Sequence, residues 1–323
     1  MVNRFTRTLR IAALLISSVI LFSGSVRADP ALRVTMIAYP PGDDFYFTIE
    51  NSARKQAKES DVNLTVQKIS SYDLASQVAV LNAAIATKPD AIIISPLDPN
   101  GLQGALQKAK DLGIKIVLYD TSTRDVSVAA TYVSADIVEL GRNAGREFEK
   151  LVGAKEGSVF YQGTAPAQPF FDALHKGWLE VTGSVPGFKH LPVNYSDFEP
   201  SKASSQMQAI LTSTPDLIGG FTGIYTDQQG NIPAIQRAGK LDQLVLIGVD
   251  GAPANVDRLK QGKLAAIVSV KARDYGVEAV KAAAAAVHGD TLPEKTLIGQ
   301  CLLKSENLTE PDNAACLYDL DRK

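Results

Sequence analysis

Two aspartates, Asp120 and Asp250, stand where a short apolar segment ends and a loop begins. The segment 114–119 is apolar or aromatic in five of its six positions, and the segment 244–249 ends at Asp250 in the same way. Such runs are typical of strands buried in a parallel sheet. Because ligands of open α/β sheets bind beyond the carboxyl ends of the strands, the two carboxylates are candidates for one shared site. The alternative for each is a turn or helix-cap aspartate.

Other predicted loops after strands place acidic residues beside aromatic ones. Carboxylates accept paired hydrogen bonds from vicinal hydroxyls, and aromatic faces cover the C–H faces of a ring, so this combination indicates a sugar or polyol pocket. The alternative is that the rings belong to the core and the acids are solvated. The residues concerned are Asp43, Asp44, Phe45, Tyr46, Phe170, Phe171, Asp172, Asp197, Phe198 and Tyr225.

The chain carries none of the motifs of nucleotide-binding loops, nucleophile elbows or zinc proteases. Its histidines, His175, His190 and His288, are scattered, which disfavours a metal site. We therefore expect a binding protein with no catalytic residue, no metal and no cofactor, and a secreted enzyme with another kind of active site is the alternative.

The elements that position these residues follow a repeating order. Short apolar strands alternate with helices of ten or more residues, which predicts parallel, doubly wound sheets. The order starts again after residue 134, and 323 residues suffice for two cores, so we expect two lobes. No linker rich in Gly, Pro or Ser separates them, which predicts a packed hinge. The second half is expected to include a helix at 232–238, and the last residues, from Leu297, are expected to hold one more short strand.

The first residues are typical of a secretory signal peptide. Arg4, Arg7 and Arg10 precede an apolar run from Ile11 to Phe22, and cleavage is expected after Ala28. Removal of 1–28 takes away four arginines and no acid, leaving 29 basic against 35 acidic residues and a net charge of −6. This charge argues against a nucleic-acid partner.

Both cysteines, Cys301 and Cys316, lie in the exported part of the chain. An oxidising compartment favours a disulfide between them over two free thiols. Metal binding by this pair is disfavoured, because two cysteines so far apart lack a tight ligand spacing.

The order of these features resembles the ribose-binding-protein group of periplasmic sugar-binding proteins. The likeness covers nearly the whole mature chain. It is carried by the signal peptide, the aromatic start, Pro96-Leu97-Asp98, Tyr119-Asp120, Gly248 to Pro253 and Gly262 to Ala266.

The resemblance implies a type I periplasmic-binding fold, in which two lobes joined by three hinge strands close on a ligand and dock on an ABC transporter permease. It implies a periplasmic monomer with a first lobe of 29–134 plus 270–293 and a second lobe of 135–269 plus 294–323. It also implies that the cysteine loop lies away from the cleft. Rival interpretations are the effector-binding half of a lactose-repressor-like regulator, disfavoured by the export signal, and a receptor for a sensor kinase.

Carried over by position, the family's aromatic clamp falls on Phe45, Tyr46 and Phe198, and its ligand-gripping aspartates fall on Asp120 and Asp250. Several positions depart from ribose binders. Asp43 and Asp44 stand ahead of the ring pair, Thr121 and Asp172 replace arginines, Ile224 beside Tyr225 replaces an asparagine, and Val270 replaces a glutamine. The likeness therefore predicts a neutral sugar or polyol other than ribose, with a cationic amino-sugar as the alternative.

Overall fold

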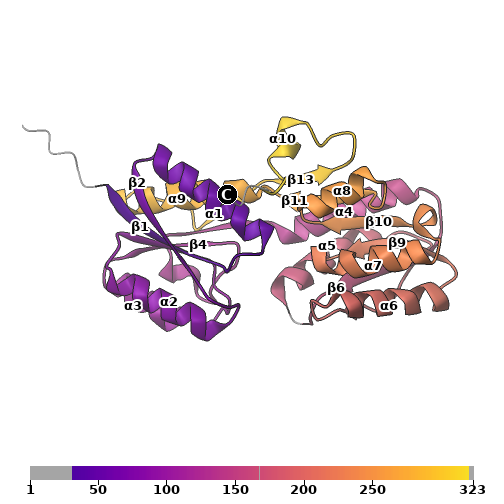
Figure 1. Cartoon of the computed structure of the whole chain (residues 1–323), viewed down its shortest axis with the longest axis horizontal. Helices are drawn as coiled ribbons and strands as arrows, with labels where there is room; N and C mark the ends of the chain where they lie inside the picture. The colour runs from indigo at the N-terminus through magenta and orange to yellow at the C-terminus, as the bar shows by residue number, and fades with distance from the viewer. Residues whose placement is uncertain (1–30, 167, 320–323) are drawn as a thin grey trace, which may run out of the picture. The chain divides into compact units, whose positions relative to one another are not determined.

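The computed structural model describes residues 31–166 and 168–319 (Figure 1). The predicted signal peptide, residues 1–28, lies outside them. The described chain forms two α/β lobes, each built around its own sheet, as predicted. Among the described residues, no helix combines the length and the apolar character needed to cross a membrane.

The sheet of the first lobe is parallel throughout, with strand order β12-β5-β4-β3-β1-β2. Helices α1 and α9 pack together on one face of this sheet, and α2 and α3 cover the other (Figure 1). The bounds are β1 Leu32–Ala38, α1 Asp44–Glu59, β2 Val62–Lys68, α2 Leu74–Ala86, β3 Ala91–Ile94, α3 Gln103–Asp111, β4 Lys115–Tyr119, β5 Thr131–Ala135, α9 Ala272–His288 and β12 Lys295–Ile298. A short 3-10 turn spans Val126–Val128.

The sheet of the second lobe has the order β13-β11-β10-β9-β6-β7, with β8 paired to β6 and β13 antiparallel to β11. Alternate residues of its strands face two different helix layers. Val159 and Tyr161 pack with α4 and α5, while Phe160 between them packs with α6 and α7. The bounds are α4 Ile137–Val152, β6 Gly157–Gly163, α5 Pro169–Thr182, β7 Phe188–His190, β8 Asn194–Tyr195, α6 Pro200–Ser213, β9 Leu217–Thr222, α7 Tyr225–Arg237, β10 Val245–Val249, α8 Pro253–Lys260, β11 Ala266–Val270, β13 Gln300–Leu303 and α10 Pro311–Ala314.

Glycines allow α4 and α5 to pack closely. A Cβ atom on Gly177 would lie 1.9 Å from the backbone oxygen of Val138, and one on Gly141 would lie 2.1 Å from the backbone oxygen of Leu174. Both distances are far shorter than any real contact, so these two positions require glycine. The close approach also brings Phe148 of α4 onto the edge of Trp178 of α5.

The chain passes between the sheets at three points, after β5, after β11 and between β12 and β13. These crossing points contact one another. The Lys271 N–H donates to the Gly299 oxygen at 2.9 Å, and the Gln300 side chain donates to the Asp136 oxygen at 2.6 Å. The three segments therefore form the connected hinge that the resemblance implied.

Two expectations differ from the structure. Residues 294–323 were expected to belong wholly to the second lobe, but β12 pairs with β5 of the first sheet and only β13 joins the second sheet. The chain therefore crosses to the second lobe for the third time at Gly299, the single residue between β12 and β13. Helix α7 begins at Tyr225, seven residues before the predicted start. Its first turns bury Asp227 and Gln228, so hydrophobic periodicity does not reveal them.

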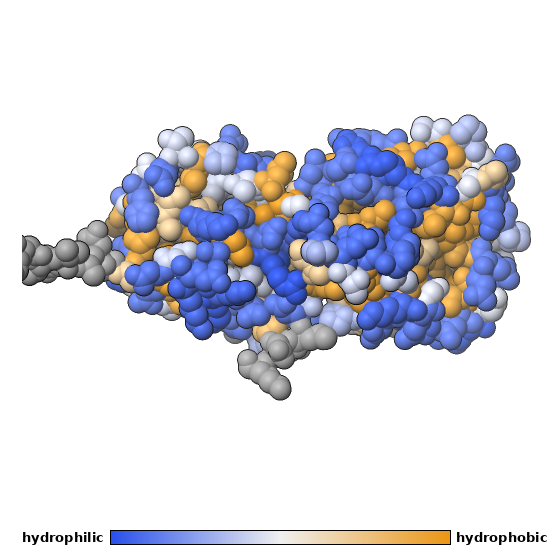
Figure 2. All heavy atoms as spheres, turned by 90° about the horizontal axis from the view of Figure 1, so that it is seen from above, coloured by the Kyte–Doolittle hydropathy of each residue, from blue (hydrophilic) through white to orange (hydrophobic). Residues whose placement is uncertain are grey.

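The face of the molecule in Figure 2 is mainly hydrophilic, with hydrophobic residues visible between the polar ones. Hydrophobic residues among polar ones are usual on a folded surface, since much of any such surface is apolar.

Candidate functional site

Asp120 and Asp250 occupy equivalent places, directly after β4 and β10. Both have left-handed backbones, with φ of 60° and 78°. This conformation costs an L residue about 1 kcal/mol, and aspartate tolerates it better than most. Each residue still donates its N–H to the neighbouring strand, Asp120 to Val133 and Asp250 to Val268. The same strand-end geometry therefore turns one aspartate out of each sheet.

Hydroxyl groups surround Asp120. Tyr46 donates its hydroxyl to the Asp120 Oδ2 at 2.8 Å, and Tyr132 donates to the Asp120 backbone oxygen at 2.5 Å. The ring of Tyr46 stacks on Tyr39, with 3.8 Å between centroids. Burial raises the pKa of Asp120 to about 6, although the hydrogen bond from Tyr46 opposes the rise. Asp120 is thus a partly buried acceptor held by aromatic residues.

Asp250 is held in a comparable way. Tyr318 donates its hydroxyl to Asp250 Oδ1 at 3.0 Å, and the Tyr225 N–H at the start of α7 lies 3.4 Å from Oδ2. Burial, together with the smaller effects of the Asp43 and Asp120 charges, raises the pKa of Asp250 to about 6, although the hydrogen bond from Tyr318 opposes the rise. The carboxylates of the two lobes therefore lie within electrostatic range of one another.

The start of α1 supplies a third acid and two rings. Asp43 is the N-cap, and its Oδ1 accepts from the N–H groups of Phe45 at 2.8 Å and Tyr46 at 3.3 Å. It therefore caps the helix, a role that was not predicted for it from the sequence, and its charge also acts on Asp120 and Asp250. The ring of Phe45 packs edge-on against that of Tyr46, with 5.1 Å between the ring centroids. Asp44 lies in the first turn, where a negative charge is favourable to the helix dipole.

Thr121 and Tyr225 lie directly beside this group. The Thr121 hydroxyl donates to the Pro96 oxygen at 2.6 Å, so it ties the loop after β4 to the loop after β3. The guanidinium of Arg258 lies 5.5 Å from the centre of the Tyr225 ring. This arginine was not foreseen, and it places one cation near a region that the sequence predicted to be acidic.

Phe198 and Asp172 have their described contacts within the second lobe. Phe198 is 47% exposed, has φ of 63°, and lies 6.1 Å from the ring of Phe171. Asp172 is exposed in the first turn of α5 and lines a shallow pocket with His175 and Lys176. The ligand-binding roles of Phe198 and Asp172, like those of the other predicted site residues, stay predictions.

Sequence reasoning missed several tyrosines. Tyr39 follows β1 directly and donates its hydroxyl to the Ser95 oxygen at 3.0 Å, and Tyr72 stacks on Tyr39 at 5.3 Å. The expectation that ligands bind beyond the carboxyl ends of strands, which pointed to Asp120, applies equally to Tyr39. No local signal pointed to Tyr318, whose ring lies 5.6 Å from Phe45. The expectation that the cysteine loop lies away from the site is therefore wrong, because the chain returns to the site just after the second cysteine.

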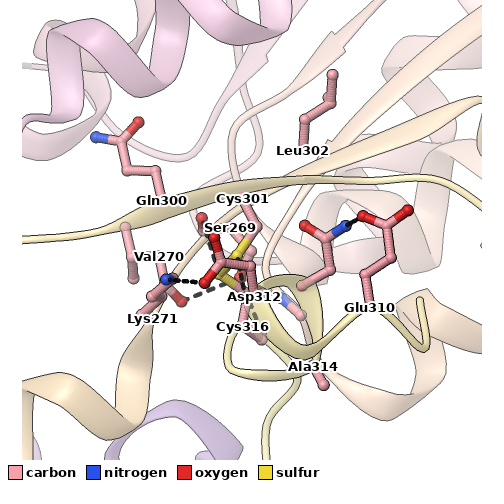
Figure 3. The surroundings of a disulfide bond; sticks show 12 residues. Ser269, Val270, Lys271, Gln300, Cys301, Leu302, Glu310, Asp312, Ala314 and Cys316 are labelled. Atoms are coloured by element: carbon pink, nitrogen blue, oxygen red, sulfur yellow. Dashed lines mark hydrogen bonds and ion pairs between the residues drawn. A yellow bond between two sulfur atoms is a disulfide. The ribbon is translucent and has the colours of Figure 1, made fainter. Parts of the chain in front are cut away.

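The predicted disulfide between Cys301 and Cys316 is present (Figure 3). It joins β13 to the loop that leads to Tyr318. Within the described residues, no group of three or more His, Cys, Asp or Glu side chains is arranged to hold a metal ion.

Comparison with known proteins supports the geometry. The family model described as a periplasmic binding protein domain matches residues 34–291. The ribose import binding protein of Salmonella typhimurium is 26% identical over 88% of this chain and 94% of its own length. A D-apiose import binding protein of Paraburkholderia graminis is 27% identical over 94% and 97%. An ABC transporter solute-binding protein from Agrobacterium vitis, solved with α-D-tagatopyranose, is 28% identical, with a TM-score of 0.79 over 89% and 99% of the two chains.

Proposed function

Because the chain belongs to the periplasmic binding protein family, we propose that it captures a neutral sugar or polyol between its two lobes and delivers it to an ABC transporter permease. It acts in the periplasm as a monomeric receptor, after cleavage behind Ala28, and catalyses no reaction. Relatives that import ribose and D-apiose support the ligand class.

One observation carries this proposal. Asp120 and Asp250 leave the two sheets with the same left-handed backbone, and each carboxylate is held by a tyrosine hydroxyl. An aspartate has more acceptor positions than one tyrosine fills, so the others are available to ligand hydroxyls. The rings of Phe45 and Tyr46 beside them suit the C–H face of a sugar.

The charges of the site decide between ligand classes. Besides burial, the charge of Asp43 raises the pKa of Asp120, and the charges of Asp43 and Asp120 raise the pKa of Asp250, so an added anion would meet like charges in a poorly solvated site. A neutral polyol adds donors without charge. An amino-sugar is the second candidate, because its ammonium would pair with this cluster of acids.

A thermal-shift screen tests the proposal, because a ligand that binds only the folded state raises the melting temperature by mass action. The panel is D-ribose, D-allose, D-apiose, D-tagatose, glucosamine and glucuronate. We expect stabilisation by at least one neutral sugar and none by glucuronate. Calorimetry with chromatographic recovery of unchanged sugar separates a receptor from an enzyme.

Two variants and one matched control locate the site. Asp120→Asn and Asp250→Asn remove one charge each and keep the side-chain shape, so each should lose most of the stabilisation by sugar. The control is Asp216→Asn, since Asp216 lies at the amino end of β9 and pairs there with Lys189. Equal stabilisation of all three variants would place the ligand elsewhere.

A further inference from the structure

We propose that the C-terminal segment 301–319, which includes the loop closed by the Cys301–Cys316 disulfide, is part of the binding site, and that Tyr318, two residues after this loop, is a positioning residue for the carboxylate of Asp250. This inference rests on the proposed function and adds a residue to that same site. The loop leaves β13 at Leu303, passes through α10 and returns at Cys316 to the strand ends of the second lobe.

The loop is fastened beside Asp250 by a close backbone approach. The Cys316 oxygen accepts a hydrogen bond from the Ser269 hydroxyl at 3.2 Å, and the same hydroxyl oxygen accepts from the Gly251 N–H at 3.0 Å. Tyr318 donates its N–H to the Gly251 oxygen at 3.0 Å. A Cβ atom on Gly251 would lie 1.9 Å from the Cys316 oxygen. The residue after Asp250 must therefore be glycine for the loop to dock.

Tyr318 completes the surroundings of Asp250. Its side chain is 6% exposed, its hydroxyl donates to Asp250 Oδ1 at 3.0 Å, and its ring lies 5.6 Å from Phe45. A hydrogen bond to a carboxylate is stronger than a neutral one and fixes the direction of the acceptor. Tyr318 thus holds the Asp250 carboxylate in one orientation before a ligand arrives, which lowers the ordering cost of binding.

Asp319, the residue after Tyr318, connects this segment to the first lobe. The Asp319 N–H donates to the Thr48 hydroxyl at 2.8 Å, and its carboxylate accepts from Asn51 at 2.8 Å. The same carboxylate accepts from the Arg273 Nε at 3.0 Å at the start of α9. The adjacent residues Tyr318 and Asp319, just after the loop, therefore contact Asp250 in one lobe and α1 and α9 in the other. The disulfide anchors this link, so its reduction should loosen Tyr318.

The test compares Tyr318→Phe with Tyr161→Phe. Tyr318→Phe keeps the ring and removes only the hydroxyl. In the control, Tyr161 is also buried and donates one hydrogen bond, to the Phe171 oxygen at 3.1 Å, away from Asp250. Calorimetry uses the panel sugar that stabilises the wild type most. We expect Tyr318→Phe to bind it about tenfold more weakly, as for loss of one hydrogen bond to a charged group, and the control to bind normally.

A second readout needs no ligand. Carbon-13 NMR follows the titration of the Asp250 carboxyl in the ligand-free proteins. The hydrogen bond from Tyr318 favours the ionised form, so the pKa of Asp250 should be higher in Tyr318→Phe than in the wild type. The pH below which sugar affinity falls should rise together with this pKa. A merely structural role of Tyr318 would change the melting temperature and leave both pH profiles in place.

The outcomes are separable. If the wild type binds no panel sugar, the proposed function fails, and the NMR titration still decides whether Tyr318 positions Asp250. If the wild type binds and Tyr318→Phe has the same affinity and the same Asp250 titration, the inference is wrong. If Tyr318→Phe does not fold, the test is made instead by measuring the sugar affinity of the wild type after its disulfide has been reduced. Reductant acts on one bond, since the chain has two cysteines, and unchanged sugar affinity after reduction would overturn the proposal.

Discussion

The substitution Asp227→Asn tests how the buried polar side of α7 affects stability. Asp227 is 0% exposed, and its Oδ1 accepts the hydroxyl of Ser196. Its Oδ2 has no hydrogen-bond partner among the described residues. Burial raises the pKa of Asp227 to about 7. The folded protein therefore binds a proton on this carboxyl more tightly than the unfolded chain does.

The magnitude follows from linkage. The difference between the ordinary pKa of 3.8 and about 7 corresponds to roughly 4 kcal/mol of unfolding free energy. Because the folded pKa is the higher one, this stability is fully present below pH 3.8. It is lost as the pH rises to about 7. At pH 8 the wild type therefore bears the full cost of a buried carboxylate.

Asparagine removes the charge and keeps the acceptor for Ser196, but it adds a buried amide group that needs a partner at a cost of about 1–3 kcal/mol. The net gain of Asp227→Asn at pH 8 should therefore be about 1–3 kcal/mol. At pH 5, where the wild-type carboxyl is mostly protonated, we expect no gain.

Urea unfolding of both proteins at pH 5, 6, 7 and 8 measures this difference. The control is Asp216→Asn, because Lys189 and Ser158 hold the pKa of the exposed Asp216 below its usual range, so its removal should not stabilise the protein at pH 8. A variant Asp227→Asn that is less stable than the wild type at pH 8, or that has the same pH slope, would refute the reasoning.

Four further outcomes are expected. Asp120→Ala and Asp250→Ala should each weaken sugar binding by about 2–3 kcal/mol in calorimetry, because a buried ligand hydroxyl loses a charged partner; normal affinity in both would move the site. Replacement of Cys301 and Cys316 by alanine should lower the unfolding free energy by about 3 kcal/mol, as expected for a loop of this length, and an unchanged urea midpoint would contradict this. Gly177→Ala should prevent normal packing of α4 on α5 and lower the melting temperature strongly, whereas a wild-type melting curve would show that the helices can separate at little cost. Small-angle scattering with saturating sugar should show a smaller radius of gyration if the lobes close on the ligand, and an unchanged radius would exclude closure.

The sequence by itself determined the features that depend on local patterns. Buried parallel strands need short apolar runs, and their alternation with helices fixed two doubly wound sheets. The same rule placed Asp120 and Asp250 at strand ends, because an acid cannot continue a strand that is buried on both faces. The cysteine pair followed from the expected compartment and from the absence of any other cysteine.

Only the tertiary structure decided which residues meet those aspartates. Tyr318 reaches Asp250 across 68 positions of sequence, and Tyr46 reaches Asp120 across 74. The polar buried side of α7 and the return of β12 to the first sheet likewise depend on neighbours that are remote in the chain. Periodicity reports which face of an element is buried, but it does not report what covers that face. The partners are set by how the two lobes and the disulfide loop pack, which is why the carboxylates were predictable and their tyrosine donors mostly were not.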